Sequence, residues 1–256
     1  MTFATSREAY DAYMGRYADR LAPLLIAFAS VQPGESVLDV GCGPGSLSEA
    51  LSAHVGAAHV SAIDPSEQFA AATAERLQDA DVRVGGAESL PWPGHTFDAA
   101  LAQLVVNFMS DPDAGVGEMR RVVRPGGTVA ACTWDYSAGM TMLRTFWDAA
   151  LALDPEAPDQ ARTMRLHNPS ELQELWLRAG LEAVEAKTLV VECSYRDFDD
   201  YWEPFTSGVG PGGAYCSSLD PDRRELLREE CRRRLGDPDG AFSLSATAWA
   251  VKGRAR

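Results

Sequence analysis

Several features that mark whole classes of protein are scarce in this sequence. Basic residues are the first, because 23 lysines and arginines stand against 37 acidic residues and leave a net charge of −14. A surface of this sign repels phosphate backbones and anionic lipids, so we expect neither nucleic-acid binding nor docking on a membrane. Residues 21–31, an early apolar stretch, are interrupted by Pro23 and fall short of the ~20 residues of a membrane span. The N-terminus also lacks the basic leader and apolar run of a signal peptide.

Cysteines are few and scattered. The sequence contains Cys42, Cys132, Cys193, Cys216 and Cys231. No two of them have the spacing of a metal site or a redox motif. We interpret them as small buried side chains in a reducing compartment, and we predict a cytoplasmic protein without a bound metal.

The first half of the sequence alternates regularly between strand-like and helix-like segments. The expected strands cover residues 36–40, 59–63, 82–84, 97–103 and 128–133, and the expected helices cover residues 46–55, 67–79 and 114–123. Strands and helices at this spacing form βαβ units with a parallel sheet and right-handed crossovers. A chain of 256 residues suits one large α/β domain. Such sheets bind their ligands at the carboxyl ends of the strands.

The second half is less regular. The expected elements are a helix that opens at residues 168–170 and ends at Gly180, a strand within residues 184–195, a helix over residues 221–235 and a closing strand over residues 241–251. Residues 207–214, SGVGPGGA, are predicted to form a flexible loop because glycine leaves the backbone unrestrained.

A glycine-rich turn, DVGCGPG at residues 39–45, follows the first expected strand. Glycines let the backbone approach a ligand closely, and free N–H groups at the start of the next helix favour an anionic group. A dinucleotide fingerprint needs its third glycine three residues after the second. Ser46 occupies that place here, and the third glycine comes early at Gly45. This departure argues against NAD or FAD.

Asp64 ends the second expected strand. A carboxylate at this place can accept hydrogen bonds from both hydroxyls of a ribose. Alternatively, Asp64 could simply begin the helix that follows Pro65. The glycine-rich turn and Asp64 both fall at carboxyl ends of strands, and this coincidence favours the ligand-binding interpretation.

Four segments resemble the successive motifs of class I S-adenosylmethionine-dependent methyltransferases, in the branch that includes the ubiquinone and menaquinone biosynthesis type. They read VLDVGCGPG, AIDPSEQF, GGAESLPWPGHTFDAALAQ and RVVRPGGTVAACTWD. The resemblance implies a doubly wound, mostly parallel, seven-stranded Rossmann-like sheet with an antiparallel closing strand and a helical, aromatic insertion over the donor site. It implies a single methyltransferase domain over residues 1–256, with a cofactor-binding core at residues 10–135 and substrate-covering insertions at residues 136–168 and 196–240.

The resemblance also implies roles for individual residues toward S-adenosylmethionine. Gly41 and Gly43 would approach its methionine part, and Asp39 would orient its amino group. The other implied contacts are Asp64 with the ribose hydroxyls, Pro65 and Phe69 beside the adenine, Ala87 and Glu88 at the adenine edge, and Gln103 beside the methionine part. Tyr17, together with Tyr13, resembles a helix that closes over the cofactor in several relatives. Simple packing is the alternative for this tyrosine pair.

The acceptor of the methyl group would bind near aromatic stretches of the second half. These stretches contain Trp134, Trp147, Tyr201, Trp202, Phe205 and Tyr215. They could line an apolar pocket for a planar or lipid-like acceptor, or they could form the core of the insertion. His167, in a loop before a helix, and Asp135, after the fifth strand, are the candidate catalytic bases. A base is needed only if the acceptor is protonated at the working pH.

We therefore predict an S-adenosylmethionine-dependent methyltransferase that acts on a small-molecule acceptor. A second hypothesis keeps the cofactor but assigns a different role, either a cyclisation or the regulation of a partner. Nicotinamide-dependent oxidoreduction is disfavoured by Ser46 and by the lack of a convincing Tyr/Lys or His catalytic set.

Overall fold

The computed structural model describes residues 11–256, which are built around one seven-stranded sheet in the order β3-β2-β1-β4-β5-β7-β6. The strands are β1 (Val37–Val40), β2 (Val60–Asp64), β3 (Asp81–Val84), β4 (Phe97–Gln103), β5 (Val123–Trp134), β6 (Glu182–Tyr195) and β7 (Phe242–Arg254). The first five pair in parallel, and β7 runs antiparallel to both β5 and β6. This arrangement confirms the predicted fold class, including the antiparallel closing strand.

The burial of each strand explains its composition. All four residues of β1 are buried, which fits a central parallel strand covered on both faces. At the edge of the sheet, β3 reads DVRV and has no buried residue. The apolar strands therefore lie in the middle of the sheet, and their carboxyl ends bring Gly41 and Asp64 to the same edge.

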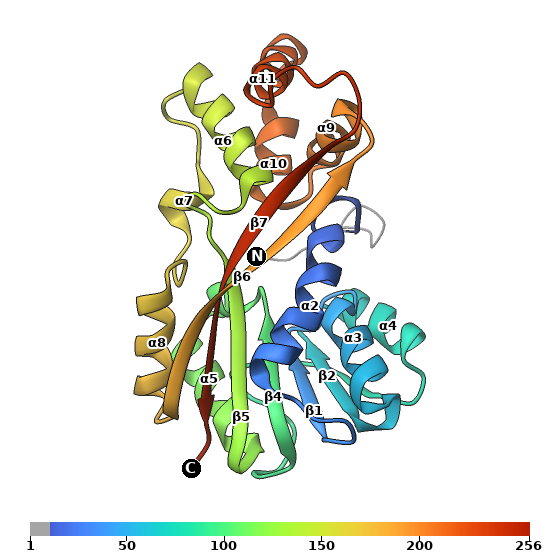
Figure 1. The fold of residues 1–256 in the computed structure, drawn as a ribbon, viewed down its shortest axis with the longest axis vertical. Helices are drawn as coiled ribbons and strands as arrows, with labels where there is room; N and C mark the ends of the chain where they lie inside the picture. Colours follow the sequence, from blue (N-terminus) through green and yellow to red (C-terminus); the bar gives the residue numbers. More distant parts are fainter. Residues whose placement is uncertain (1–10) are drawn as a thin grey trace.

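Helices cover both faces of the sheet. They are α2 (Arg16–Ala29), α3 (Ser46–Val55), α4 (Glu67–Arg76), α5 (Pro112–Val122) and α8 (Pro169–Arg178), with short turns η1 (Asp11–Gly15), η2 (Ala57–His59) and η3 (Val106–Phe108). Figure 1 shows α2, α3 and α4 on one side of the sheet and α5 and α8 on the other. Within residues 11–256, no helix is both long and apolar enough to cross a membrane.

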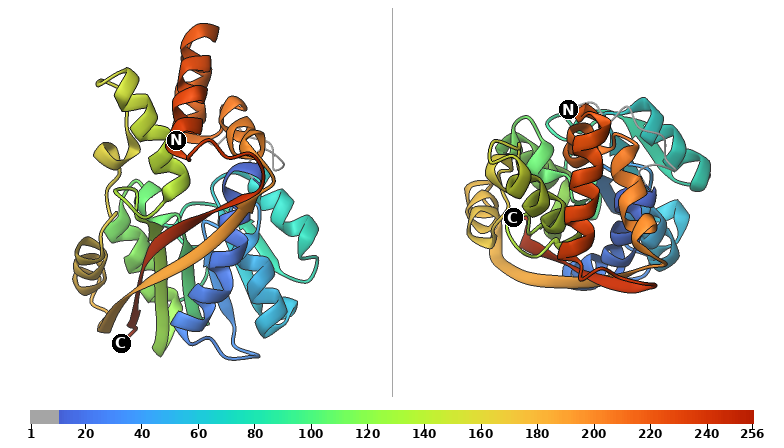
Figure 2. Two further views of the ribbon diagram at one scale, coloured as in Figure 1. Left: turned by 45° about the horizontal axis from the view of Figure 1, so that its top comes forward. Right: turned by 90° about the horizontal axis from the view of Figure 1, so that it is seen from above.

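The remaining helices gather above the carboxyl edge of the sheet and form what we call the cap (Figures 1 and 2). The cap consists of α6 (Thr141–Leu153), α7 (Gln160–Thr163), α9 (Phe198–Thr206), α10 (Gly210–Ser218) and α11 (Pro221–Arg234). Strands β6 and β7 reach into it, because β7 pairs with β5 only as far as Ala248 but continues along β6 to Phe242. This two-stranded extension connects the cap to the sheet.

The prediction of a flexible loop at residues 207–214 is wrong, since α10 begins at Gly210. Pro211 stands in the first turn of this helix, where a missing N–H group costs nothing. Gly213 is required for close packing, because a Cβ there would lie 2.7 Å from the carbonyl carbon of Gly208. Glycine in this segment allows tight contact and does not produce a loop.

Most of the aromatic residues of the second half form the core of the cap. Trp147, Tyr201, Trp202 and Phe205 are buried, and the ring of Phe205 stacks on Phe146 with centroids 4.3 Å apart. The sequence allowed two roles for these aromatic residues, lining an acceptor pocket or forming the core of the insertion, and these four form the core. Trp134 differs, because it also lines the cavity described below.

Candidate functional site

A cavity of about 480 Å³ lies where the carboxyl edge of the sheet meets the cap. Gly41, which follows β1, and Asp64, which ends β2, line it from the sheet. Leu143 of α6, Gln160 of α7 and Gly210 of α10 line it from the cap. The cavity is therefore shared by the two parts of the molecule.

The glycine-rich turn shapes one wall of this cavity. Gly41 has a φ of 73°, and a Cβ at this position would lie 2.4 Å from Cγ2 of Val105. The Gly41 N–H group donates to the carbonyl of Ile63 at 2.8 Å, which holds the turn against the end of β2. Gly43 also has a positive φ, 53°, but a Cβ there would meet open space. Glycine at position 41 is thus required by packing and conformation together, and glycine at position 43 by conformation alone.

Asp64 is 7% exposed at the end of β2 and lines the cavity. Its Oδ2 accepts a hydrogen bond from the Gly43 N–H group at 2.9 Å, and its Oδ1 accepts one from Ser66 at 2.8 Å. Burial raises the pKa of this carboxyl, while the two backbone donors lower it. Each carboxylate oxygen can accept a further hydrogen bond from a ligand hydroxyl.

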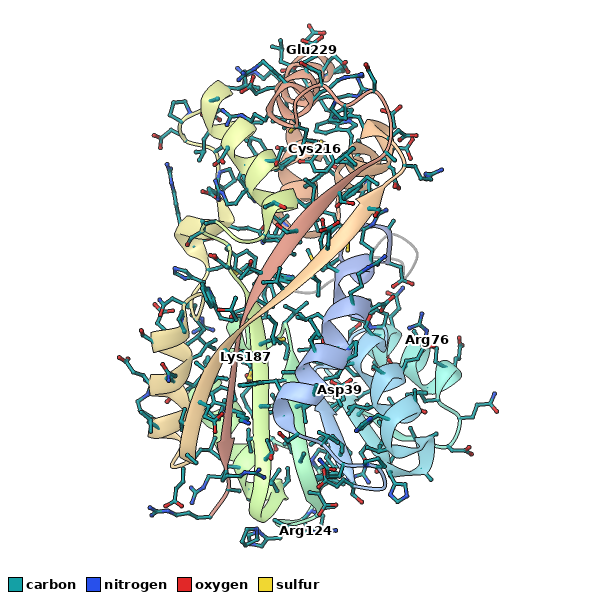
Figure 3. The ribbon with its side chains drawn as sticks, in the orientation of Figure 1. Asp39, Arg76, Arg124, Lys187, Cys216 and Glu229 are labelled. Atoms are coloured by element: carbon teal, nitrogen blue, oxygen red, sulfur yellow. The ribbon has the colours of Figure 1, made fainter. Side chains whose placement is uncertain are left out.

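Asp39 lies on β1 near the middle of the molecule, where Figure 3 labels it, and is 1% exposed. The Ser48 hydroxyl donates to its Oδ2 at 2.5 Å, and its Oδ1 has no hydrogen-bond partner among the described residues. Burial raises the pKa of Asp39 to about 7, and the charge of Asp64 adds to the effect. A buried carboxyl with one free oxygen is costly unless a ligand completes it.

A smaller cavity of about 30 Å³ is lined by Asp39, Ser46 and Gln103. Each of these side chains has a buried oxygen without a hydrogen-bond partner in the part of the chain that is described, namely Oδ1, Oγ and Oε1 respectively. Gln103 is oriented by its amide nitrogen, which donates to the carbonyl of Ala18 at 3.1 Å. Oxygens of this kind accept hydrogen bonds, and an ammonium group offers three donors. The small cavity therefore suits an ammonium group.

Most of the residues expected to bind the cofactor line one of these two cavities. The larger one is lined by Gly41, Gly43, Asp64, Pro65, Phe69, Ala87, Glu88 and Gln103. Asp39 lines the smaller one. Glu88 has an additional structural role, because its Oε1 accepts hydrogen bonds from the N–H groups of Ser110 and Asp111.

Tyr17 lies elsewhere, although it was predicted to close over the cofactor. It is completely buried and lines neither cavity. Its hydroxyl shares a 2.9 Å hydrogen bond with the hydroxyl of Tyr195, and its ring packs edge-on against Trp134. Tyr17 thus belongs to the core, and Tyr13 is the member of the pair that lines the larger cavity.

The two candidate bases also lie outside both cavity linings. Asp135 closes a turn, since its carboxylate accepts hydrogen bonds from the N–H groups of Ser137, Ala138 and Gly139 at 2.9 to 3.2 Å. The Nδ1 atom of His167 is bonded to the carbonyl of Met164 at 2.7 Å. Asp135 stabilises local backbone in this arrangement, and neither residue faces the site.

Sequence reasoning missed several residues that complete the larger cavity. They are Met14, Phe108, Met109, Tyr136, Leu143, Gln160 and Val209. They come from separate elements, including η3, α6, α7 and the residue before α10. They share no spacing or motif, so the sequence carries no signal that could have grouped them.

Comparisons with known proteins agree with this geometry. A family profile described as "Methyltransferase domain" matches residues 38–131. The ubiquinone/menaquinone biosynthesis C-methyltransferase UbiE of Ralstonia pickettii is 32% identical over 176 residues, which cover 62% of this chain and 72% of that protein. The solved structure of the YcgJ protein from Bacillus subtilis matches with a TM-score of 0.60 and 18% identity, over 93% of this chain and 98% of that one. The solved structure of the 4+2 cyclase SpnF matches with a TM-score of 0.57 and 21% identity, over 92% of this chain and 80% of that one.

Proposed function

This chain belongs to the class I S-adenosylmethionine-dependent methyltransferases, and on that premise we propose that it transfers the methyl group of S-adenosylmethionine to a small-molecule acceptor. The observation that carries the proposal is the group of unpaired oxygens on Asp39, Ser46 and Gln103 beside the glycine-rich turn. Three acceptors around one enclosed space fit the amino group of the methionine part of this cofactor.

The other cofactor contacts that we propose follow from the residues that line the larger cavity. The Asp64 carboxylate, oriented by two backbone N–H groups, would accept the ribose hydroxyls. Pro65 and Phe69, which line the cavity after β2, would flank the adenine, and Ala87 and Glu88 would lie at its edge. The cavity therefore offers a polar place for the ribose and an apolar place for the base.

The reaction asks little acid–base chemistry of this chain. The sulfonium of the bound cofactor would supply a methyl group activated by positive charge. Among the described residues, the titratable side chains that line the cavity away from Asp64 and Glu88 are Tyr13 and Tyr136. Burial raises the pKa of both phenols, so they stay protonated. The contribution of the residues is to exclude water and align two reactants, an effect worth about 7–11 kcal/mol in well-oriented reactions.

The position of the cavity supports an acceptor of small size. The cap helices stand over the carboxyl edge of the sheet (Figure 2), and residues of α6, α7 and α10 close the cavity from above. A pocket of this size suits a small molecule. We propose that the insertions at residues 136–168 and 196–240, which contain these helices, select the acceptor.

Isothermal titration calorimetry with S-adenosylmethionine and S-adenosylhomocysteine tests the proposal. We expect both to bind, and we expect Asp64→Ala to weaken both about tenfold or more because the ribose loses charged acceptors. Asp113→Ala, at an exposed position on α5, is the matched control and should bind normally. Absence of binding at millimolar concentrations of either compound would refute the proposal.

A second candidate function is a cofactor-dependent cyclisation without methyl transfer. We consider this alternative because the cyclase SpnF shares the fold of this chain. The two functions differ in what happens to the donor. Release of S-adenosylhomocysteine in the presence of small-molecule extracts supports methyl transfer, whereas tight binding of an S-adenosylmethionine that stays intact supports a role without methyl transfer, such as cyclisation.

A further inference from the structure

The part of the larger cavity that faces the cap is mainly apolar. We call this part the cap half and define it by its lining residues Met14, Trp134, Tyr136, Leu143, Gln160 and Val209. The carboxylates that line the cavity, Asp64 and Glu88, belong to its other half, and no lysine or arginine lines it among residues 11–256. A charged molecule in the cap half would be desolvated without a counter-charge, which is costly. This lining selects uncharged molecules.

Gln160 is a polar exception in the cap half. It is 5% exposed and lines the cavity as the first residue of α7. The indole N–H of Trp147 donates to its Oε1 at 3.1 Å, and this bond fixes which end of the amide carries the nitrogen. The Trp147 bond occupies the oxygen end of the amide, so Nε2 is the end left for a ligand in the cavity that Gln160 lines. A buried amide in this orientation offers two N–H donors to a ligand.

Neighbouring charges hold Gln160 in place. Asp159 caps α7 by accepting a hydrogen bond from the Ala161 N–H group at 3.0 Å. Arg144 of α6 reaches the same carboxylate with two hydrogen bonds of 2.8 and 3.0 Å, and both side chains are nearly buried. The amide is therefore presented by a segment that is tied to α6, which is the preorganisation that a recognition site requires.

Tyr13 also lines the cavity, and its hydroxyl is a second buried polar group of this region. This hydroxyl has no hydrogen-bond partner in the described part of the chain. The hydroxyl lies against the first turn of α10, since a Cβ on Gly212 would come within 3.2 Å of it. Burial, with the nearby phenol of Tyr136, raises the pKa of Tyr13, so the hydroxyl keeps its proton.

We propose that the cap half binds an uncharged, mainly apolar acceptor through an oxygen atom, such as a carbonyl, that accepts a hydrogen bond from the Gln160 amide. This assignment deepens the proposed function, on which it rests, and it makes Gln160 a specificity-determining residue. The acceptor class is set by an apolar lining, fixed donors and the lack of a lining cation among the described residues.

Three small probes of similar shape test the assignment. Acetophenone carries a carbonyl, ethylbenzene lacks it, and benzoate is charged. Each is titrated by ligand-observed NMR into the protein saturated with S-adenosylhomocysteine. The informative quantity is the ratio of the acetophenone and ethylbenzene dissociation constants, because this ratio cancels changes in apolar packing.

Two variants of Gln160 should change this ratio. Gln160→Met removes the donors with little change of volume, and Gln160→Glu keeps an oxygen for Trp147 but replaces the donors. In both, we expect acetophenone to weaken about three- to tenfold relative to ethylbenzene, as for loss of one neutral hydrogen bond. Gln160→Glu keeps the contact with Trp147 and Gln160→Met does not, so the same change of the ratio in both variants assigns the effect to the lost donors. Gln173→Met, on α8 outside the cavity, is the control and should leave the ratio unchanged.

The outcomes separate this inference from the proposed function. If S-adenosylhomocysteine does not bind, the proposed function itself is refuted before any probe is added. If it binds, an unchanged ratio in folded Gln160 variants overturns the role of Gln160. Tighter binding of benzoate than of acetophenone, or no acetophenone binding at millimolar concentrations, overturns the uncharged oxygenated acceptor. Should both variants fail to fold, Gln160→Ala takes their place, and an unchanged ratio there also refutes the assignment.

Discussion

Single buried polar groups explain much of this site. Asp39, Ser46 and Gln103 each bury an oxygen without a partner, although burial without hydrogen bonding destabilises a fold by about 1–3 kcal/mol per group. Such groups are normally paired in proteins, so three of them around one small cavity indicate a missing ligand group. Asp39 is the most informative of the three because it can change its charge.

The affinity for S-adenosylhomocysteine should depend on the ionisation of Asp39. Burial raises the pKa of this carboxyl to about 7, so more acidic solutions leave it neutral in the ligand-free protein. An ammonium group prefers the ionised carboxylate, and affinity should therefore rise with pH up to about 7 and then level off. The stability of the ligand-free protein should change in the opposite direction. Its free energy of unfolding should fall as the pH rises toward the raised pKa, because the buried carboxyl then becomes ionised.

Calorimetric titrations over a pH series measure this effect. Asp39→Asn should bind more weakly and lose the pH dependence below about 7. Asp113→Asn, at a surface position paired with Arg178, should behave like the original protein. An affinity that does not change with pH in the original protein would contradict the role of Asp39.

The two glycines of the turn should differ in their tolerance of alanine. In Gly41→Ala the new methyl group would collide with Val105 at 2.4 Å, so we expect a large loss of thermal stability. In Gly43→Ala the methyl group meets open space, and the positive φ alone should cost about 1 kcal/mol. Thermal unfolding compares the variants directly, and equal destabilisation would show that packing against Val105 is unimportant.

At the scale of elements, the contact between α6 and α7 positions the cap over the site. Arg144 of α6 binds Asp159, which precedes α7, and Asp148, one turn further along α6. The Asp159 end of this network is 5% exposed, whereas Asp148 is 48% exposed. The buried partner should therefore matter more than the exposed one.

Asp159→Ala should lower the free energy of unfolding by about 2–3 kcal/mol, because it removes both the cap of α7 and the buried partner of Arg144. Asp148→Ala is the matched control, and an exposed pair of this kind contributes less than about 1 kcal/mol. Chemical denaturation gives both values. A larger effect at Asp148 would show that the buried contact does not hold α7.

At the scale of the whole molecule, the cap and one face of the sheet share a single hydrophobic core. The same buried cluster contains Leu47 of α3, Leu101 of β4, Phe146 of α6 and Cys231 of α11. Because these residues pack together, the cap cannot detach without exposing the core of the sheet. We therefore expect the protein to unfold cooperatively.

Ligand binding should stabilise the whole molecule in one step. S-adenosylhomocysteine at about 100 times its dissociation constant should raise the free energy of unfolding by about 2.7 kcal/mol. For a domain of this size, that corresponds to an increase in melting temperature of about 5–10 °C. Differential scanning calorimetry should show one transition that moves as a unit. Two transitions, of which only one moves, would contradict the shared core.

The donor part of the site was predictable because its residues are close to one another in sequence and follow successive strands. Asp39, Gly41 and Gly43 belong to one turn, and Asp64 ends the next strand, so the rule that parallel strands align their carboxyl ends brings them together. The same local reasoning did not place Tyr17, His167 and Asp135, which lie outside both cavity linings. Their hydrogen-bond partners depend on packing, which a local pattern does not describe.

The cap half depended on the tertiary structure throughout. Tyr13 and Gln160 are far apart in the sequence and line one cavity because the cap lies above the carboxyl edge of the sheet. Local motifs thus specify the fold and the cofactor-binding edge, since backbone geometry and strand order place those residues. The acceptor side is assembled from contacts between distant segments, and only the folded chain shows which donors remain unpaired there.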